Sequence, residues 1–137
     1  MEQITVRAAH DQVRIVTDFV NRHLVKLGCS EHTRVQVDVA IDEIFSNIAR
    51  YAYRPGTGGA ATVRVEVGEN PLSVIITFID RGVAFDPLAH EQPDTTKLPA
   101  HKRPVGGLGL FMVKKTMDNI SYEYRDGQNI LTIRKEI

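Results

Sequence analysis

The spacing of apolar side chains predicts a short strand and two helices in the first half of the chain. Residues 2–8 alternate between polar and apolar positions, which is typical of a half-buried strand. Between Asp11 and Gly28, apolar residues recur every three or four positions, so we expect an amphipathic helix that ends at the glycine. Ser30 is suited to a helix N-cap, and a second helix should reach about Tyr53. Its buried stripe would consist of Val37, Ile41, Ile44, Phe45, Ile48 and Ala52.

Strand patterns dominate the second half of the chain, apart from one helix. Segments 61–67 and 72–79 alternate and are joined by the turn sequence GENP, which predicts a pair of strands. Apolar helical spacing returns over 108–117, and two further strands, 120–126 and 129–137, flank an Asp-Gly turn. This order predicts an α+β fold. It would be a two-layer α/β sandwich with the helices on one face of a mixed, mainly antiparallel sheet.

Composition and charge narrow the class of protein. The 137 residues are 42% apolar and 25% charged, which is ordinary for a single globular domain over residues 1–137. Basic and acidic residues balance at 17 each, so no net charge attracts the chain to nucleic acid or to a membrane. The start lacks a signal-peptide core, and Cys29 has no second cysteine to pair with. We therefore expect a cytoplasmic domain without direct nucleic-acid or membrane partners.

Two polar residues interrupt the apolar stripe of the second helix. Glu43 and Asn47 are four positions apart, so they share one face of the helix. An isolated pair of this kind is usually a solvated surface pair. Here Asn47 lies between Phe45 and Ile48, although asparagine is a poor helix former. An amide oxygen could hold Mg²⁺ there while the carboxylate handles a proton or a water molecule.

A second candidate follows the strand at 72–79. Asp80 comes directly after an apolar run, so its carboxylate should lie at the edge of the core, where a charge needs a partner. An aspartate two residues before a glycine is more often part of a turn. With a ligand present, Asp80 could accept a hydrogen bond from an amino group, and Gly82 would let a flat ring approach closely.

The third candidate is the sequence GGLG at residues 106–109, at the start of the helix at 108–117. Glycine costs roughly 0.5–1 kcal/mol against alanine inside a helix, so three in four positions require a reason. Exposed amides at a helix N-terminus bind anions such as phosphates. The motif lacks the Gly-Lys-Ser/Thr of a P-loop, and it follows a long loop, not the strand of a dinucleotide-binding fingerprint. That proline-rich loop, 81–105, has no periodicity, and a loop of this length is usually functional or disordered.

Taken together, the three motifs resemble the GHKL (Bergerat) ATP-binding superfamily. The segments EIFSNIARYAY, DRGVAFDP and GGLGLFMVKK are similar to the stand-alone bacterial anti-sigma factor serine/threonine kinases of that superfamily. The resemblance spans essentially the whole chain. It implies the Bergerat fold, the cofactors ATP and Mg²⁺, and a lid over the nucleotide at about 87–105.

The resemblance also implies a role for each motif residue. Glu43 would be the catalytic base, Asn47 the Mg²⁺ ligand and Asp80 the acceptor for the adenine amino group. Gly82 would lie beside the adenine. The phosphate-binding loop would consist of Gly106, Gly107, Leu108 and Gly109.

Two positions depart from the pattern of the resembled kinases. Tyr51 stands where anti-sigma kinases carry a histidine, and Arg50 would supply the positive charge near the phosphates instead. Ala84 replaces the second glycine of the D-x-G-x-G motif. The first departure bears on phosphate contacts and catalytic rate, and the second affects the pocket only slightly.

The resemblance leads us to expect a protein kinase that transfers the ATP γ-phosphoryl group to a serine or threonine. Its substrate would be a STAS-domain anti-sigma antagonist, in a partner switch that regulates transcription and involves a sigma factor. Dimerisation through the first strand and helix is also implied. Two alternatives stay open: a nucleotide-binding module that only sequesters a regulator, and a solitary ATPase. A sensor histidine kinase is disfavoured because a phosphoacceptor dimerisation helix does not fit in this length, and a gyrase-type ATPase would need a transducer domain.

Overall fold

The helices and strands occur in the predicted order. The structure is a computed structural model, and it describes residues 1–88 and 107–137, with only the backbone for residues 107–109. The second helix ends at Tyr51, two residues before the predicted end. The elements are β1 (Glu2–Arg7), a 3-10 turn η1 (His10–Gln12), α1 (Val13–Lys26), α2 (Glu31–Tyr51), β2 (Ala60–Gly68), β3 (Ser73–Asp80), α3 (Gly107–Thr116), β4 (Asn119–Arg125) and β5 (Gln128–Glu136).

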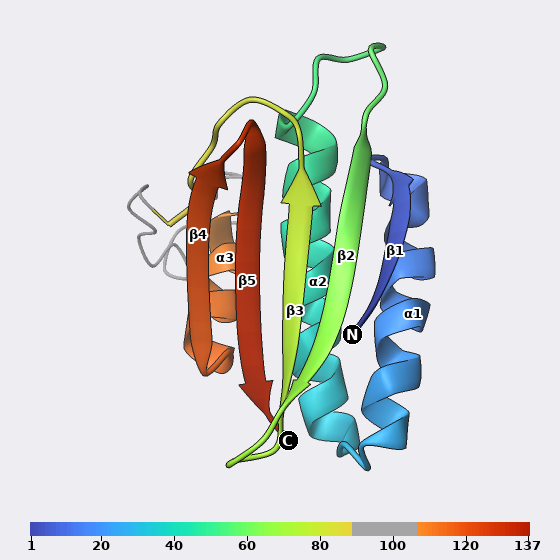
Figure 1. Cartoon of the computed structure of the whole chain (residues 1–137), viewed down its shortest axis with the longest axis vertical. Coiled ribbons are helices and arrows are strands. Elements are labelled where there is room, and N and C mark those ends of the chain that lie inside the picture. The colour runs from blue at the N-terminus through green and yellow to red at the C-terminus, as the bar shows by residue number, and fades with distance from the viewer. Residues whose placement is uncertain (89–106) are drawn as a thin grey trace.

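Five strands form one sheet, in the order β1-β2-β3-β5-β4. The helices cover one face of this sheet, and the strands face the viewer in Figure 1. The α+β sandwich predicted from the sequence is therefore confirmed. Each of the four strand pairings in the described part of the chain is antiparallel, so the sheet there is not mixed.

The core fills the space between the sheet and the helices. Alternate side chains of the central strands point toward the helices, and the register aligns Phe78 of β3 between Val63 of β2 and Leu131 of β5. On α1, the buried side chains recur at helical spacing, at Val16, Phe19, Val20 and Leu24. The predicted stripe of α2 is also buried, except that Ile48 is only half-buried.

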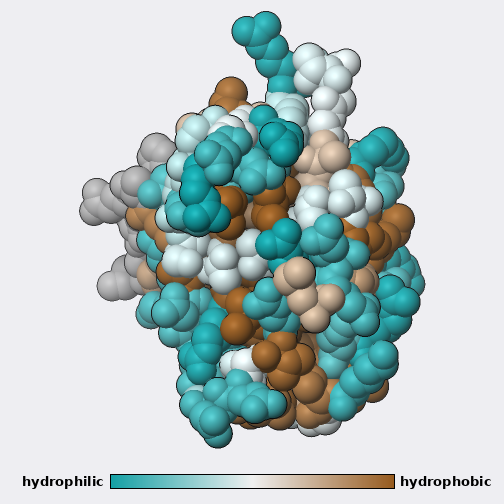
Figure 2. All heavy atoms as spheres, in the orientation of Figure 1, coloured by the Kyte–Doolittle hydropathy of each residue, from teal (hydrophilic) through white to brown (hydrophobic). Residues whose placement is uncertain are grey.

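The opposite face of the sheet is open and mixed in character (Figure 2). Cross-strand threonine pairs occupy part of it: the hydroxyls of Thr5 and Thr62 are 2.8 Å apart, and those of Thr77 and Thr132 are 3.5 Å apart. Such pairs stabilise neighbouring strands without an apolar cover.

Local motifs fix where the elements begin and end. The backbone N–H of Thr33 donates to the Ser30 hydroxyl at 3.2 Å, so the predicted N-cap of α2 is confirmed. The β4–β5 hairpin turns at Asp126 and Gly127, which both have positive φ, as a tight two-residue turn requires. These boundaries bring the C-terminal end of β3, the start of β5 and the C-terminal half of α2 together around one cavity.

Candidate active site

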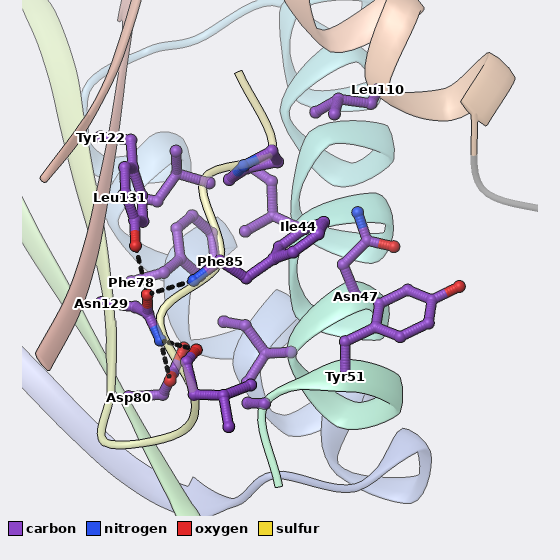
Figure 3. Close-up of a pocket in the computed structure, with 14 residues that line it drawn as sticks. Ile44, Asn47, Tyr51, Phe78, Asp80, Phe85, Leu110, Tyr122, Asn129 and Leu131 are labelled. Atoms are coloured by element: carbon purple, nitrogen blue, oxygen red, sulfur yellow. Dashed lines mark hydrogen bonds between the residues drawn. The ribbon is translucent and has the colours of Figure 1, made fainter. Parts of the chain in front are cut away.

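A cavity lies between α2 and the adjoining ends of β3 and β5 (Figure 3). It contains about 490 Å³ of space between atoms, of which a large part belongs to its open mouth. Leu110 of α3 also borders it, so each of the three sequence motifs contributes an element to its wall. The lining side chains are Ile44, Asn47, Ile48, Tyr51, Ala52, Phe78, Asp80, Val83, Phe85, Pro87, Leu110, Tyr122, Asn129 and Leu131.

Asp80 places a buried carboxylate in this mostly apolar wall. The residue is only 5% exposed, and its Oδ1 accepts hydrogen bonds from the Gly82 N–H and from Nδ2 of Asn129, both at 2.9 Å. Within residues 1–88 and 107–137, Oδ2 of Asp80 has no hydrogen-bond donor. Oδ1 is therefore hydrogen-bonded within the protein, while Oδ2 can accept a hydrogen bond from a donor group on a ligand.

Gly82 has a packing role that the sequence did not reveal. A Cβ at this position would collide with the carbonyl oxygen of Ala52 and would lie 2.6 Å from the Ala52 Cβ. The next N–H, of Val83, donates to that same carbonyl at 2.9 Å. The backbone at Gly82 thus packs against the end of α2, and the side chain of Val83, not Gly82, lines the cavity.

On the α2 side, Asn47 lines the cavity and Glu43 lies one turn before it. The side-chain amide of Asn47 has no partner among the described residues. The Oε1 atom of Glu43 is buried and likewise lacks a hydrogen bond to any described residue. This burial raises the pKa of the Glu43 carboxyl, while the positive charge of Arg50 partly opposes the shift.

These donor atoms fit Mg²⁺ bound together with a nucleotide. The described residues contain no group of three His, Cys, Asp or Glu side chains that could hold a metal ion alone. Mg²⁺ commonly binds through one or two protein oxygens plus substrate phosphates and water, and the amide of Asn47, which lines the cavity without a partner among the described residues, suits that mode. Arg50 is exposed and does not line the cavity, although its charge acts on Glu43.

The two departures from the kinase pattern differ in their surroundings. Tyr51 lies on the rim of the cavity, and its ring centroid is 6.0 Å from that of Phe85. An aromatic pair therefore lines the mouth at the position of the expected histidine. Ala84 is exposed and does not line the cavity.

The predicted phosphate-binding loop is only partly described. The backbone of Gly107, Leu108 and Gly109 forms the first turn of α3, whereas Gly106 lies outside the described residues. The predicted lid at 87–105 also lies outside them, apart from Pro87 and Leu88.

Two residues that organise the wall were not predicted from the sequence. Asn129 hydrogen-bonds Asp80, Val83, Phe85 and Tyr122. The hydroxyl of Tyr53 accepts from the Arg81 N–H at 2.9 Å and donates to the Ala60 carbonyl at 2.7 Å. The strand pattern could have indicated Asn129, because it lies on the same inward-facing side of the strand as Leu131 and Ile133. It is therefore a polar residue at a core position.

A two-layer domain with one buried carboxylate in an apolar cavity, beside a glycine-containing helix start, has the features of a nucleotide-binding protein. Residues 6–135 match the family model described as "Histidine kinase-like ATPase domain", and the chain belongs to this family. The resemblance to GHKL proteins is thereby confirmed, and membership of an ATPase family implies that the chain uses ATP. No helix of the described segments is long and apolar enough to cross a membrane.

Several curated relatives carry kinase names. The serine-protein kinase RsbW of Listeria innocua is 27% identical over 109 residues, covering 77% of this chain and 68% of that protein. The serine/threonine-protein kinase BtrW of Bordetella bronchiseptica is 30% identical over 104 residues, covering 76% of this chain and 71% of that protein. A serine-protein kinase RsbW of Bacillus cereus is 31% identical over 109 residues, covering 77% of this chain and 66% of that protein.

Proposed function

We propose that the chain is an ATP- and Mg²⁺-dependent serine/threonine protein kinase. The observation that carries the proposal is the buried Oε1 of Glu43, which lacks a partner in the described residues and lies one helical turn from the unpartnered amide of Asn47 at the cavity. A buried carboxylate oxygen rarely lacks a partner in a folded protein, so the lack of one among the described residues supports a ligand at this end of the cavity. The kinase names of the relatives add independent support.

Each motif has a distinct task in this reaction. Oδ2 of Asp80 accepts a hydrogen bond from the adenine amino group, and the backbone N–H groups of Gly107 and Gly109, in the first turn of α3, bind the phosphates. Asn47 holds Mg²⁺, which when bound neutralises charge on the phosphates. Arg50 adds positive charge near Glu43.

Glu43 orients the attacking hydroxyl and accepts its proton. The hydroxyl oxygen of the substrate forms a bond to the γ-phosphorus, and the bond from that phosphorus to the β–γ bridging oxygen breaks, releasing ADP. A carboxyl whose pKa burial has raised is a stronger base once it is ionised. In this proposal, another protein presents the hydroxyl at the mouth of the cavity.

The proposed substrate is a serine or threonine of a STAS-domain anti-sigma antagonist, with a sigma factor as the competing partner in the cytoplasm. The resemblance to anti-sigma kinases supports this part of the proposal. Phosphorylation of the antagonist would change which partner the kinase holds, and this change would regulate transcription.

A second candidate function rests on Tyr51. This residue is 48% exposed on the cavity rim, at the position where the resembled kinases carry a histidine. A chain that binds ATP but transfers phosphate poorly would act as a sequestering module, with the nucleotide only shaping its partner-binding surface.

The kinase proposal predicts that Glu43→Ala separates nucleotide binding from phosphoryl transfer. Loss of a general base lowers the rate by about 10²- to 10⁴-fold. Nucleotide affinity should change little because Glu43 does not line the cavity. In the assay, the chain is incubated with radiolabelled ATP and a STAS-domain protein encoded by a neighbouring gene. Labelled partner and free phosphate are measured in parallel.

Glu31→Ala is the matched control, because Glu31 is an exposed acidic residue at the opposite end of α2 and its charge is not among the causes of the Glu43 pKa shift. It should transfer label at the wild-type rate. Label on a partner serine or threonine that is lost only in Glu43→Ala supports the kinase. Free phosphate without labelled partner indicates a solitary ATPase, and tight partner binding with neither product indicates the sequestering module.

A further inference from the structure

The side chain of Asn129 is fully hydrogen-bonded inside the cavity wall. Its Nδ2 donates to Oδ1 of Asp80 at 2.9 Å and to the carbonyl oxygen of Val83 at 2.8 Å. Its Oδ1 accepts from the N–H of Phe85 at 3.1 Å and from the hydroxyl of Tyr122. An asparagine amide offers two donor hydrogens and two acceptor lone pairs, so all four positions are occupied.

The chemistry of the partners fixes the orientation of this amide. A carboxylate and a carbonyl only accept hydrogen bonds, and a backbone N–H only donates. Rotating the amide by 180° would place an oxygen against Asp80 and Val83 and an NH₂ group against the N–H of Phe85. The orientation in Figure 3 is therefore the one that satisfies all of these partners.

The four bonds connect three parts of the fold. Asn129 pairs directly with Asp80 in the β3–β5 register, while Val83 and Phe85 belong to the loop after β3. Tyr122 lies on β4, and burial raises the pKa of its phenol. Asn129 is 7% exposed, so this network is in the low-dielectric wall, where a missing partner is costly.

We propose that Asn129 is a positioning residue that sets the base specificity of the cavity. Together with the Gly82 N–H, it holds Oδ1 of Asp80, so the carboxylate has a fixed rotation and its other oxygen is kept as the acceptor for a purine amino group. Asn129 itself does not contact the base, because its hydrogen-bonding capacity is used up. Tyr122 is the second anchor, since its hydroxyl holds the acceptor end of the amide. This inference rests on the proposed contact between Asp80 and adenine.

The proposal is tested by the preference for ATP over purine ribonucleoside triphosphate, which lacks only the 6-amino group. In the wild-type chain, the analogue should bind about 10- to 150-fold more weakly, since one hydrogen bond to a charged group is lost. In Asn129→Ala, the preference should fall to about threefold or less, because the Gly82 N–H is then the one remaining described donor at Oδ1 and does not by itself fix the rotation of the carboxylate. Calorimetry with both nucleotides gives the two affinities, and thermal unfolding verifies that the variant is folded.

Ile133→Ala is the matched control for lost stability. Ile133 is 1% exposed, lies on the same strand and does not line the cavity, so this variant should lose stability and keep the wild-type preference. A general loosening of the fold lowers both affinities together and leaves their ratio unchanged. If folded Asn129→Ala keeps the wild-type ratio, Asn129 does not position Asp80 and the proposal is overturned.

Tyr122→Phe provides a second test if Asn129→Ala does not fold. It removes one hydroxyl and keeps the ring in the wall, so the preference should fall part of the way, by about threefold or more. An unchanged ratio in this variant also overturns the proposal.

A wild-type chain that binds no ATP refutes the proposed function itself, and a wild-type chain that binds both nucleotides equally refutes the adenine contact of Asp80. These two results are distinguishable from a failure of Asn129 alone.

Discussion

Gly82 has two competing explanations, and a single substitution separates them. If the glycine is needed only so that a base can approach, Gly82→Ala should weaken nucleotide binding and leave the free protein as stable as before. If it is needed because the loop packs on the end of α2, the substitution should destabilise the protein without any ligand. The contact with Ala52 favours the second explanation.

The size of the effect follows from the contacts. The new Cβ would meet the backbone carbonyl of Ala52, which cannot move aside as a flexible side chain could. Overpacking of this kind costs about 1–3 kcal/mol. Displacing the loop would also stretch the 2.9 Å hydrogen bond from the Val83 N–H to Ala52, which is worth about 0.5–1.5 kcal/mol. We therefore expect a loss of about 2–4 kcal/mol in the free energy of unfolding.

Thermal unfolding without nucleotide measures this loss. For a chain of 137 residues, the unfolding entropy is about 0.3 kcal/mol per kelvin, so Tm should fall by about 7–14 °C. Arg81→Ala is the control, because Arg81 is the exposed neighbour in the same loop, and its Tm should change by less than about 2 °C. A Gly82→Ala protein that unfolds within about 2 °C of wild type would refute the packing explanation.

Two further predictions concern the carboxylates. In Asp80→Asn, the donors at Oδ1 should turn the new amide so that its NH₂ group faces the ligand amino group. ATP affinity measured by calorimetry should then fall by about 10- to 150-fold. Wild-type affinity in this variant would contradict the assigned contact. Burial raises the pKa of Glu43 in the folded state above its ordinary value of 4.5, so ionisation of this carboxyl opposes folding once the pH exceeds 4.5. Glu43→Gln removes this cost and should therefore stabilise the protein increasingly as the pH rises above 4.5. Thermal unfolding from pH 4 to pH 8 measures this effect, and a stability difference independent of pH would contradict it.

Local sequence patterns were sufficient to predict the elements and two polar side chains that line the cavity, Asn47 and Asp80. The alternation of β3, the helical spacing of α2 and the N-cap at Ser30 each depend on residues only a few positions apart, so the chain specifies them without reference to the rest of the fold. The three motifs were found for the same reason. Each is a short run in which a polar residue or glycine stands where its element would otherwise be apolar or regular.

The tertiary structure alone decided how those motifs are held. Asn129 is 49 residues from Asp80, and the two meet only because β5 pairs with β3 instead of lying outside β4. Gly82 meets Ala52 because the end of α2 lies against the loop after β3. That Glu43 Oε1 is buried without a partner among residues 1–88 and 107–137 also depends on which side chains surround it after folding. Contacts of this kind depend on strand order and burial, which residue spacing along the chain does not encode, so the sequence indicated the reactive groups but not the residues that orient them.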